Sequence, residues 1–226
     1  EREPPLRRSV LITLFSAEEV GAIGSAALTK NSPVPHEQIV CMLNFDMVGR
    51  LRDNTLLLGG AGTALEFDEL LAGLEREHGI TFSQDRSGFG GSDHLNYMQH
   101  DNPVLFFFTG AHQEYHSPFD TAELVNVDGI ARIAALAAEL VSRIDARDEM
   151  LTFERPEGAP VSQRATRESI SVSMGTIPSF EETSSQGYLL GDVRPGGPAA
   201  EAGLQGGDLI VKIRDRRIAS IYDFMF

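Results

Sequence analysis

The sequence has one cysteine, no long apolar run and no excess of basic residues. With Cys41 alone, an intramolecular disulfide and a zinc site built from several cysteines are both excluded. No apolar stretch approaches the ~18–20 residues that cross a bilayer, so we expect no membrane span. The 19 basic and 33 acidic residues give a formal charge of −14. This balance disfavours a nucleic-acid partner, which binds proteins that neutralise its phosphates.

What remains is an ordinary globular composition, with 42% hydrophobic and 23% charged residues among 226. A chain of this length forms one large domain or two smaller ones, and it buries a substantial core without disulfides. Aperiodic, proline- and glycine-rich sequence follows Met150. We therefore predict a domain over residues 1–150, a linker over 151–168 and a small β-rich domain over 169–226.

Short apolar runs rich in β-branched and aromatic residues predict the buried strands of the first domain. They lie at residues 9–15, 39–45, 55–58 and 103–108. Helical periodicity or small-residue content predicts helices between and after them, at 21–28, 65–78, 92–99 (with Ser92 as its cap) and 130–144. Strands that are apolar on both faces and alternate with helices define an α/β fold. The expected architecture is a mostly parallel sheet covered by helices.

Three polar clusters follow directly on predicted strands, at residues 16–19, 44–46 and 109–116. Because the carboxyl ends of strands in open α/β sheets line a common crevice, these clusters are expected to converge. Carboxylates and an imidazole at such an edge suit zinc, which accepts both oxygen and nitrogen ligands.

Each cluster also has a purely structural interpretation. Ser16 and Glu19 have the spacing of a capping box, so the glutamate pair is also compatible with an ordinary helix start. Asp46 is compatible with a turn or a helix cap. His116, which precedes Ser117-Pro118, is compatible with an ordinary loop histidine.

Taken together, four motifs in order resemble the co-catalytic di-zinc exopeptidases. This family includes bacterial leucyl aminopeptidase, glutamate carboxypeptidase II and, more distantly, glutaminyl cyclase. The resemblance covers about residues 7–146. The motifs are Phe15-Ser16-Ala17-Glu18-Glu19-Val20-Gly21-Ala22-Ile23-Gly24-Ser25, Asn44-Phe45-Asp46-Met47-Val48-Gly49-Arg50, Ser92-Asp93-His94 and Tyr115-His116-Ser117-Pro118 with Asp120-Thr121.

The resemblance implies a role for each matching residue and two zinc ions per complete site. Glu18 would be the general base, while Glu19 and His116 would bind one zinc. Asp46 would bind the other zinc, and Tyr115 would donate a hydrogen bond to the developing oxyanion. Supporting or pocket-shaping roles are implied for Asp93, His94 and Asp120. Adjacent glutamates suit this chemistry, because one holds the metal while the other moves the proton.

The sequence departs from the family pattern upstream of the Glu18-Glu19 pair. There the family has a histidine ligand and an aspartate that bridges the two zincs, whereas residues 1–9 contain neither. We therefore expect the chain to be a piece of a longer protein and to be inactive by itself. Its localisation is not encoded in these residues, and export is favoured by the resemblance alone.

The tail resembles a bacterial PDZ domain that is cut short at its end. The resemblance rests on Gly187-Tyr188-Leu189-Leu190-Gly191-Asp192-Val193, Pro195-Gly196-Gly197-Pro198-Ala199-Ala200, Ala202-Gly203-Leu204 and Gly207-Asp208-Leu209-Ile210. By this analogy the loop Ser173-Met174-Gly175-Thr176 would capture the carboxylate of a C-terminal peptide through its backbone N–H groups. A purely structural β-rich domain is the alternative.

The function predicted from the sequence is zinc-dependent removal of N-terminal residues from peptides through a metal-activated water. Glutaminyl cyclisation is a second enzymatic hypothesis, disfavoured because the motif over residues 18–25 matches the peptidases better. A third hypothesis is a non-catalytic relative that lost its zinc ligands and serves as a scaffold.

Overall fold

The computed structural model describes residues 5–19, 21–88, 91–112, 114–156, 174–178, 187–193 and 195–218. The chain forms two compact units. The first comprises Glu1–Thr109 with Glu123–Gln163, and the second comprises Gly110–Ala122 with Arg164–Phe226. The segment Gly110–Ala122 thus clusters with the second unit, although it lies inside the domain predicted over residues 1–150. Most of the predicted linker lies outside the described residues.

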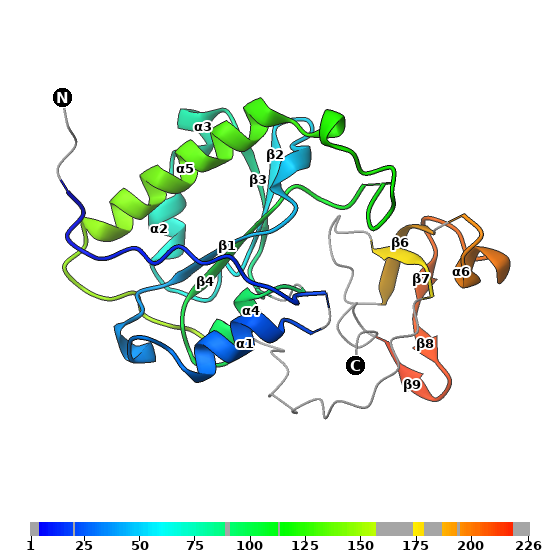
Figure 1. Cartoon of the computed structure of the whole chain (residues 1–226), viewed down its shortest axis with the longest axis horizontal. Helices are drawn as coiled ribbons and strands as arrows, with labels where there is room; N and C mark the ends of the chain where they lie inside the picture. Colours follow the sequence, from blue (N-terminus) through cyan, green and yellow to red (C-terminus); the bar gives the residue numbers. More distant parts are fainter. Residues whose placement is uncertain are drawn as a thin grey trace. The chain divides into compact units, whose positions relative to one another are not determined.

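The first unit is built on a four-stranded sheet whose strands follow the order β1-β4-β2-β3 (Figure 1). These strands are β1 (Met42–Phe45), β2 (Thr55–Gly59), β3 (Thr81–Asp85) and β4 (Val104–Phe108). The pairs β1–β4 and β2–β3 are parallel, whereas β2 and β4 are antiparallel. The mostly parallel α/β sheet expected from the sequence is therefore confirmed, with one antiparallel junction.

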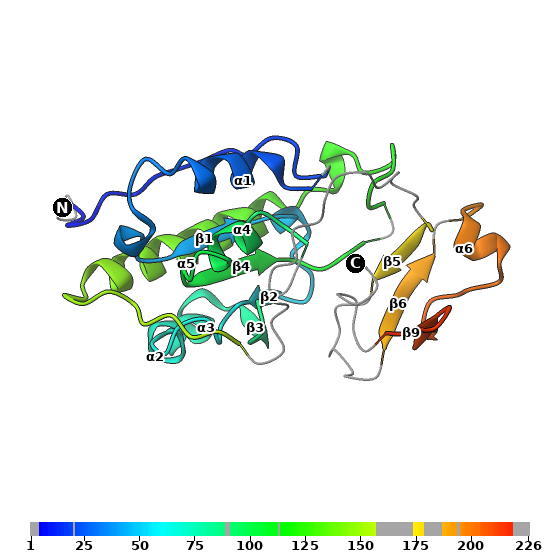
Figure 2. The same ribbon diagram turned by 90° about the horizontal axis from the view of Figure 1, so that it is seen from below.

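Helices cover both faces of this sheet (Figures 1 and 2). One face carries α2 (Phe67–Leu71), α3 (Leu74–His78) and α5 (Val127–Asp145), and the other carries α1 (Ile23–Lys30) and α4 (His94–Met98). Short 3₁₀ turns are η1 (His36–Gln38), η2 (Val48–Arg50) and η3 (Ala122–Leu124). Among the described residues, no helix is long and apolar enough to cross a membrane.

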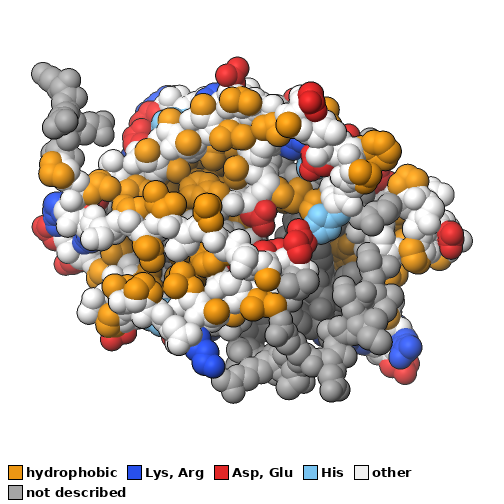
Figure 3. Space-filling model, viewed as in Figure 1, with side chains coloured by type: hydrophobic (Ala, Val, Ile, Leu, Met, Phe, Trp, Pro, Cys, Tyr) orange, Lys and Arg blue, Asp and Glu red, His pale blue; other side chains and the backbone are white. Residues whose placement is uncertain are grey.

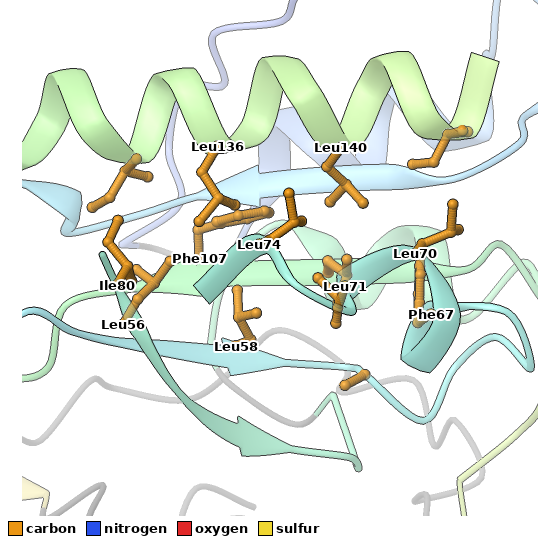
Figure 4. Packing of buried hydrophobic residues seen from close by; sticks show 14 of the residues in the cluster. Leu56, Leu58, Phe67, Leu70, Leu71, Leu74, Ile80, Phe107, Leu136 and Leu140 are labelled. Carbon is orange, nitrogen blue, oxygen red and sulfur yellow. The ribbon is translucent and has the colours of Figure 1, made fainter. Parts of the chain in front are cut away.

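The main core lies between α5 and the sheet (Figure 4). Leu136 and Leu140 project from α5 toward Phe107 of β4 and Leu58 of β2, and all four side chains are fully buried. Burying one such side chain contributes about 1.5–3 kcal/mol. Val104 of β4 instead packs in a second cluster, with Tyr97 and Met98 of α4. Strand β4 is thus buried on both faces, which explains its unbroken apolar sequence.

Two local predictions fail for identifiable reasons. The helix predicted over residues 65–78 is divided into α2 and α3, because Gly73 adopts φ +83° between them. Gly79 follows α3 in the left-handed conformation, and the helix ends at His78, the last residue of the predicted range. Strand β3 was not predicted, since it lies at the sheet edge and most of its side chains are exposed. An exposed edge strand lacks the apolar run that marks its buried neighbours.

The buried strand predicted at residues 9–15 is wrong. This segment is not a strand, and Val10, Ile12 and Leu14 are 55%, 85% and 97% exposed. It runs along the β1 side of the sheet (Figures 1 and 2), on a surface rich in apolar side chains (Figure 3). No main-chain hydrogen bond joins residues 9–15 to any other described residue. Local sequence encodes the tendency to be a buried strand, but a strand also needs a pairing partner and cover.

The second unit contains a small antiparallel sheet in the order β5-β6-β7. Its elements are β5 (Thr176–Pro178), β6 (Tyr188–Val193), α6 (Pro198–Glu201), β7 (Leu209–Ile210), and the hairpin of β8 (Lys212–Ile213) and β9 (Arg216–Arg217). Tyr188, Leu190 and Ile218 form its core. These elements agree with the predicted β-rich domain, although the run predicted at residues 169–172 lies outside the described residues.

Candidate functional site

Glu18 and Glu19 lie in a tight turn that leads into α1. The backbone N–H groups of Gly21 and Ala22 donate to the carbonyl of Glu18, at 2.9 and 2.8 Å. Helix α1 begins after Ala22 without a side-chain cap, so the capping-box interpretation of Ser16 and Glu19 is wrong. A methyl group on Gly24 would lie 2.5 Å from the carbonyl oxygen of Ser16, so glycine is required there. The local structure therefore presents the glutamate pair outside the helix.

Asp46 follows β1 at its carboxyl end, where the sequence placed it. Its backbone N–H donates to Phe107 of β4 at 3.2 Å, which ties the start of the turn to the neighbouring strand. The hydroxyl of Thr109 donates to the carbonyl of Met47, and Arg50 N–H donates to that hydroxyl at 3.2 Å. The turn is thus connected to the ends of two parallel strands.

Three non-glycine residues next to or at the predicted site have left-handed backbones. Ala17, Met47 and His116 have φ values of 58°, 51° and 53°. Ala17 precedes Glu18, and Met47 follows Asp46. Such conformations cost of order 1–3 kcal/mol each, and they concentrate at functional sites. The backbone strain is therefore consistent with a site at these turns.

The carboxylates of the first unit cluster around Glu18. Burial and, after it, the nearby carboxylates of Asp46, Glu19 and Asp93, in that order of importance, together raise the pKa of Glu18 to about 7. Burial also raises the pKa of Asp93, with Asp46 as a further cause. A carboxyl group with a pKa near 7 both accepts and returns a proton at neutral pH. Glu18 thus has the proton affinity that a general base requires.

The sequence indicated that Ser92 caps α4, but Ser92 does not cap this helix. The N-cap of α4 is Asp93, and its side chain makes no capping hydrogen bond. The Ser92 hydroxyl instead donates to Oδ2 of Asp46 at 2.8 Å, and it accepts from Nδ2 of Asn44 at 2.8 Å. Asn44 lies in a polar cluster and a motif noted from the sequence, but no role was assigned to it there. Its position two residues before Asp46 on β1 was the available signal, because alternate strand residues share a face.

His94 is completely buried and occupies both ring nitrogens with hydrogen bonds. Nε2 lies 3.0 Å from the carbonyl of Gly88, so it carries the proton. Nδ1 lies 3.3 Å from Nδ2 of Asn44, from which it accepts. Burial lowers the pKa of His94 to about 4, although the hydrogen bond to Gly88 acts in the opposite direction. His94 therefore supports the carboxylate cluster as a neutral ring.

This pKa predicts that acid destabilises the first unit. Below about pH 6.5 His94 is protonated in the unfolded chain, whereas in the folded chain it stays neutral until the pH falls to about 4. Stability therefore falls as pH falls through this window, by up to about 3 kcal/mol. Urea unfolding between pH 7 and 4 should show a shallower loss for His94→Gln than for the parent. His78→Gln, which keeps His94, should retain the loss, and an unchanged slope in His94→Gln would contradict the assignment.

Tyr115, His116 and Asp120 lie in Gly110–Ala122, which belongs to the second unit. The rings of Tyr115 and His116 stack, with centroids 3.8 Å apart. His112 received no role from the sequence, yet it is buried between Oε2 of Glu114 at 3.3 Å and Oδ2 of Asp120 at 3.6 Å. Two carboxylates thus flank the buried ring of His112 within this segment.

The structure brings together Glu18, Glu19, Asp46 and Asp93, all in the first unit. The pairing of Glu19 with His116 on one zinc joins residues of different units, and it stays a prediction. The donor types fit zinc, which accepts carboxylate oxygen and imidazole nitrogen. Among the described residues, however, no group of three or more such side chains is arranged to hold a metal. These residues do not form a complete zinc site on their own.

The fold of this chain is similar to that of a bacterial aminopeptidase of known structure. The chain is similar to the LapA aminopeptidase of Legionella pneumophila, with 23% identity and a TM-score of 0.51, over 60% of this chain and 38% of that one. It is also similar to the aminopeptidase of Aneurinibacillus sp. strain AM-1, with 24% identity and a TM-score of 0.49, over 62% and 34%. The chain thus spans well under half of these proteins, and the first likeness supports the fold.

The sequence profile of peptidase family M28 matches residues 1–141. The chain therefore belongs to peptidase family M28. Residues 190–224 match the PDZ domain, in agreement with the resemblance of the tail. No curated protein sequence matches the chain.

Proposed function

We propose that the protein is a zinc-dependent aminopeptidase that removes N-terminal residues from peptides. The observation that carries this proposal is the environment of Glu18, a half-buried carboxyl group with a pKa of about 7 beside Glu19, Asp46 and Asp93. Membership of a peptidase family supports the reaction class. A base whose pKa lies near the working pH is what proton transfer during peptide hydrolysis requires.

In this proposal Glu18 accepts a proton from the attacking water and delivers it to the leaving amine. Glu19 and His116 are the proposed ligands of one zinc, and Asp46 is a proposed ligand of a second. When bound, zinc would lower the pKa of water and polarise the scissile carbonyl. Tyr115 is the proposed hydrogen-bond donor to the developing oxyanion. Asp93, His94 and Asp120 would hold the surrounding side chains in place.

The proposal is tested on the full-length protein with leucine p-nitroanilide as substrate. Turnover should be lost with 1,10-phenanthroline and restored by added zinc. Zinc-free protein without turnover would instead support the non-catalytic scaffold. A protein that cyclises N-terminal glutamine peptides but does not cleave leucine p-nitroanilide would support glutaminyl cyclisation.

For the 226-residue chain by itself, we predict weak, non-stoichiometric zinc binding and no peptidase activity. Stable zinc sites usually have three or four protein ligands in fixed geometry. Equilibrium dialysis followed by elemental analysis should give less than one tightly bound zinc per chain. Two tightly bound zincs, or chelator-sensitive hydrolysis of leucine p-nitroanilide, would show that other residues complete the site.

The second unit is proposed to bind a peptide C-terminus at residues 174–176. Gly175 has φ +74° at the turn that precedes β5. The carbonyl of Met174 accepts from Ala199 N–H at 2.9 Å, and Tyr188 donates its hydroxyl to Oγ1 of Thr176 at 3.1 Å. These contacts support a preformed loop, and preformed backbone donors favour carboxylate capture.

This proposal predicts a preference for free carboxylates over amides. Because charge-assisted hydrogen bonds are about twice as strong as neutral ones, a free-carboxylate peptide should bind roughly tenfold more tightly than its amidated form. Isothermal titration of a small panel of apolar C-terminal peptides, each in both forms, measures the difference. Equal affinities within every pair would show that the loop does not capture a carboxylate.

A further inference from the structure

Two carboxylates near Glu18, the partly buried Asp46 and the buried Asp93, each end a chain of hydrogen bonds of the same kind. In the first chain, Nδ2 of Asn44 donates to Oγ of Ser92 at 2.8 Å, and Ser92 donates to Oδ2 of Asp46 at 2.8 Å. The second hydrogen of the Asn44 amide faces Nδ1 of His94 at 3.3 Å. Since Nε2 of His94 donates to the carbonyl of Gly88, Nδ1 is an acceptor, and the orientation of the Asn44 amide is determined.

The second chain has the same order of groups on different elements. Nδ2 of Asn96 on α4 donates to Oγ of Ser25 on α1 at 2.8 Å, and Ser25 donates to Oδ1 of Asp93. The carbonyl of Ala22 also lies 3.1 Å from the Ser25 hydroxyl. A hydroxyl has a single proton, and the charged carboxylate is the stronger acceptor.

The asparagine partners fix the direction in which each serine hydroxyl donates its hydrogen bond. Each serine oxygen accepts from an asparagine N–H, so its own proton points away toward the carboxylate. The serines are 0% (Ser25) and 3% (Ser92) exposed, and Asn44 is 6% exposed. Buried polar groups without partners are costly, so these side chains have little freedom to reorient.

The carboxylates held by these chains lie in a cluster of like charge. Glu18, Glu19, Asp46 and Asp93 are close together, and like charges repel one another. A purely structural network would neutralise or separate such groups, whereas this one holds Asp46 and Asp93 in place. Local rules are typically broken in this way at functional sites.

We infer that Asn44 and Ser92 are positioning residues that hold Asp46 in one rotamer by engaging Oδ2, so that Oδ1 can serve as the ligand atom. Ser25 and Asn96 hold Asp93 in the same manner. The consequence for metal binding rests on the proposed function, in which Asp46 is a zinc ligand. The inference that Asp46 is held in one rotamer does not depend on the proposed function.

Paired substitutions in the full-length protein separate the two chains. Ser92→Ala should free the χ1 torsion of Asp46 and leave that of Asp93 fixed, whereas Ser25→Ala should do the reverse. Three-bond couplings in the metal-free protein measure both torsions by NMR. Asn44→Asp keeps the size of the side chain but removes the donor, so it should reproduce the effect of Ser92→Ala. Ser92→Thr keeps the hydroxyl and should restore the Asp46 rotamer.

Metal affinity provides the second measurement. Loss of a group that orients a ligand lowers metal affinity by roughly 10–100-fold, so Ser92→Ala should bind zinc that much more weakly, with recovery in Ser92→Thr. Fixed Asp46 torsions in both Ser92→Ala and Asn44→Asp would overturn the inference, whatever the metal affinity. Parent protein that binds no zinc would overturn the proposed function, and the NMR couplings would still decide the role of Ser92.

Discussion

Replacing Glu18 with glutamine should lower kcat by about 10²–10⁴-fold, or roughly 3–5 kcal/mol in barrier height, with zinc still bound. Glutamine keeps the size of the side chain but does not take a proton from water. The pKa of about 7 shows that the surroundings of Glu18 favour its protonated form more than those of a surface glutamate do. Proton transfer is therefore the property that this substitution removes, and the neighbouring residue Glu19, the proposed ligand, is left intact.

Initial rates on leucine p-nitroanilide, measured with the zinc content of the same samples, test this prediction in the full-length protein. Glu19→Ala should lose metal, because it removes a proposed ligand. Glu37→Gln, the same exchange at an exposed position on η1, is the matched control and should leave both values unchanged. A Glu18→Gln enzyme with the parent rate would show that the proton is carried elsewhere.

The parts of the fold that sequence predicts well are those buried on both sides. Strands β2 and β4 have continuous apolar runs because helices cover both faces of the sheet, and their predicted bounds agree with the structure closely. Strand β3 was missed because its exposed edge position permits polar residues such as Ser83 and Gln84. Residues 9–15 were assigned wrongly because an apolar pattern does not state whether a pairing partner is present.

The candidate site, like the fold, could be predicted from the sequence only in part. The proximity of Glu18 and Asp46 was predictable, because both follow strand-like sequences that lead to one edge of an α/β sheet. The roles of Ser25, Ser92 and Asn44 were not predictable, although each residue lies in a motif noted from the sequence. Their roles depend on contacts between residues 46 to 68 positions apart, such as Ser25 with Asp93 and Ser92 with Asp46.

The exposed segment at residues 9–15 predicts self-association of the 226-residue chain. Both of its ends are anchored, since the backbone N–H groups of Arg7 and Arg8 donate to Asp145 at 2.9 and 2.8 Å and the ring of Phe15 packs against Tyr97. The chain between these anchors is extended, apolar and without main-chain partners among the described residues. Segments of this kind pair with other copies and aggregate.

Leu14→Lys should therefore increase the soluble, monomeric fraction several-fold, because Leu14 is 97% exposed and a charge at that position interrupts strand pairing. Val127→Lys is the matched control, since Val127 is 69% exposed on α5 and the substitution adds the same charge outside the segment. Light scattering after size-exclusion chromatography measures the monomer fraction of all three proteins at equal concentration. If the parent is monomeric, or if both lysine variants gain equally, the segment is not the cause. An advantage confined to Leu14→Lys would instead identify unpaired backbone and exposed side chains at residues 9–15 as the origin of the self-association.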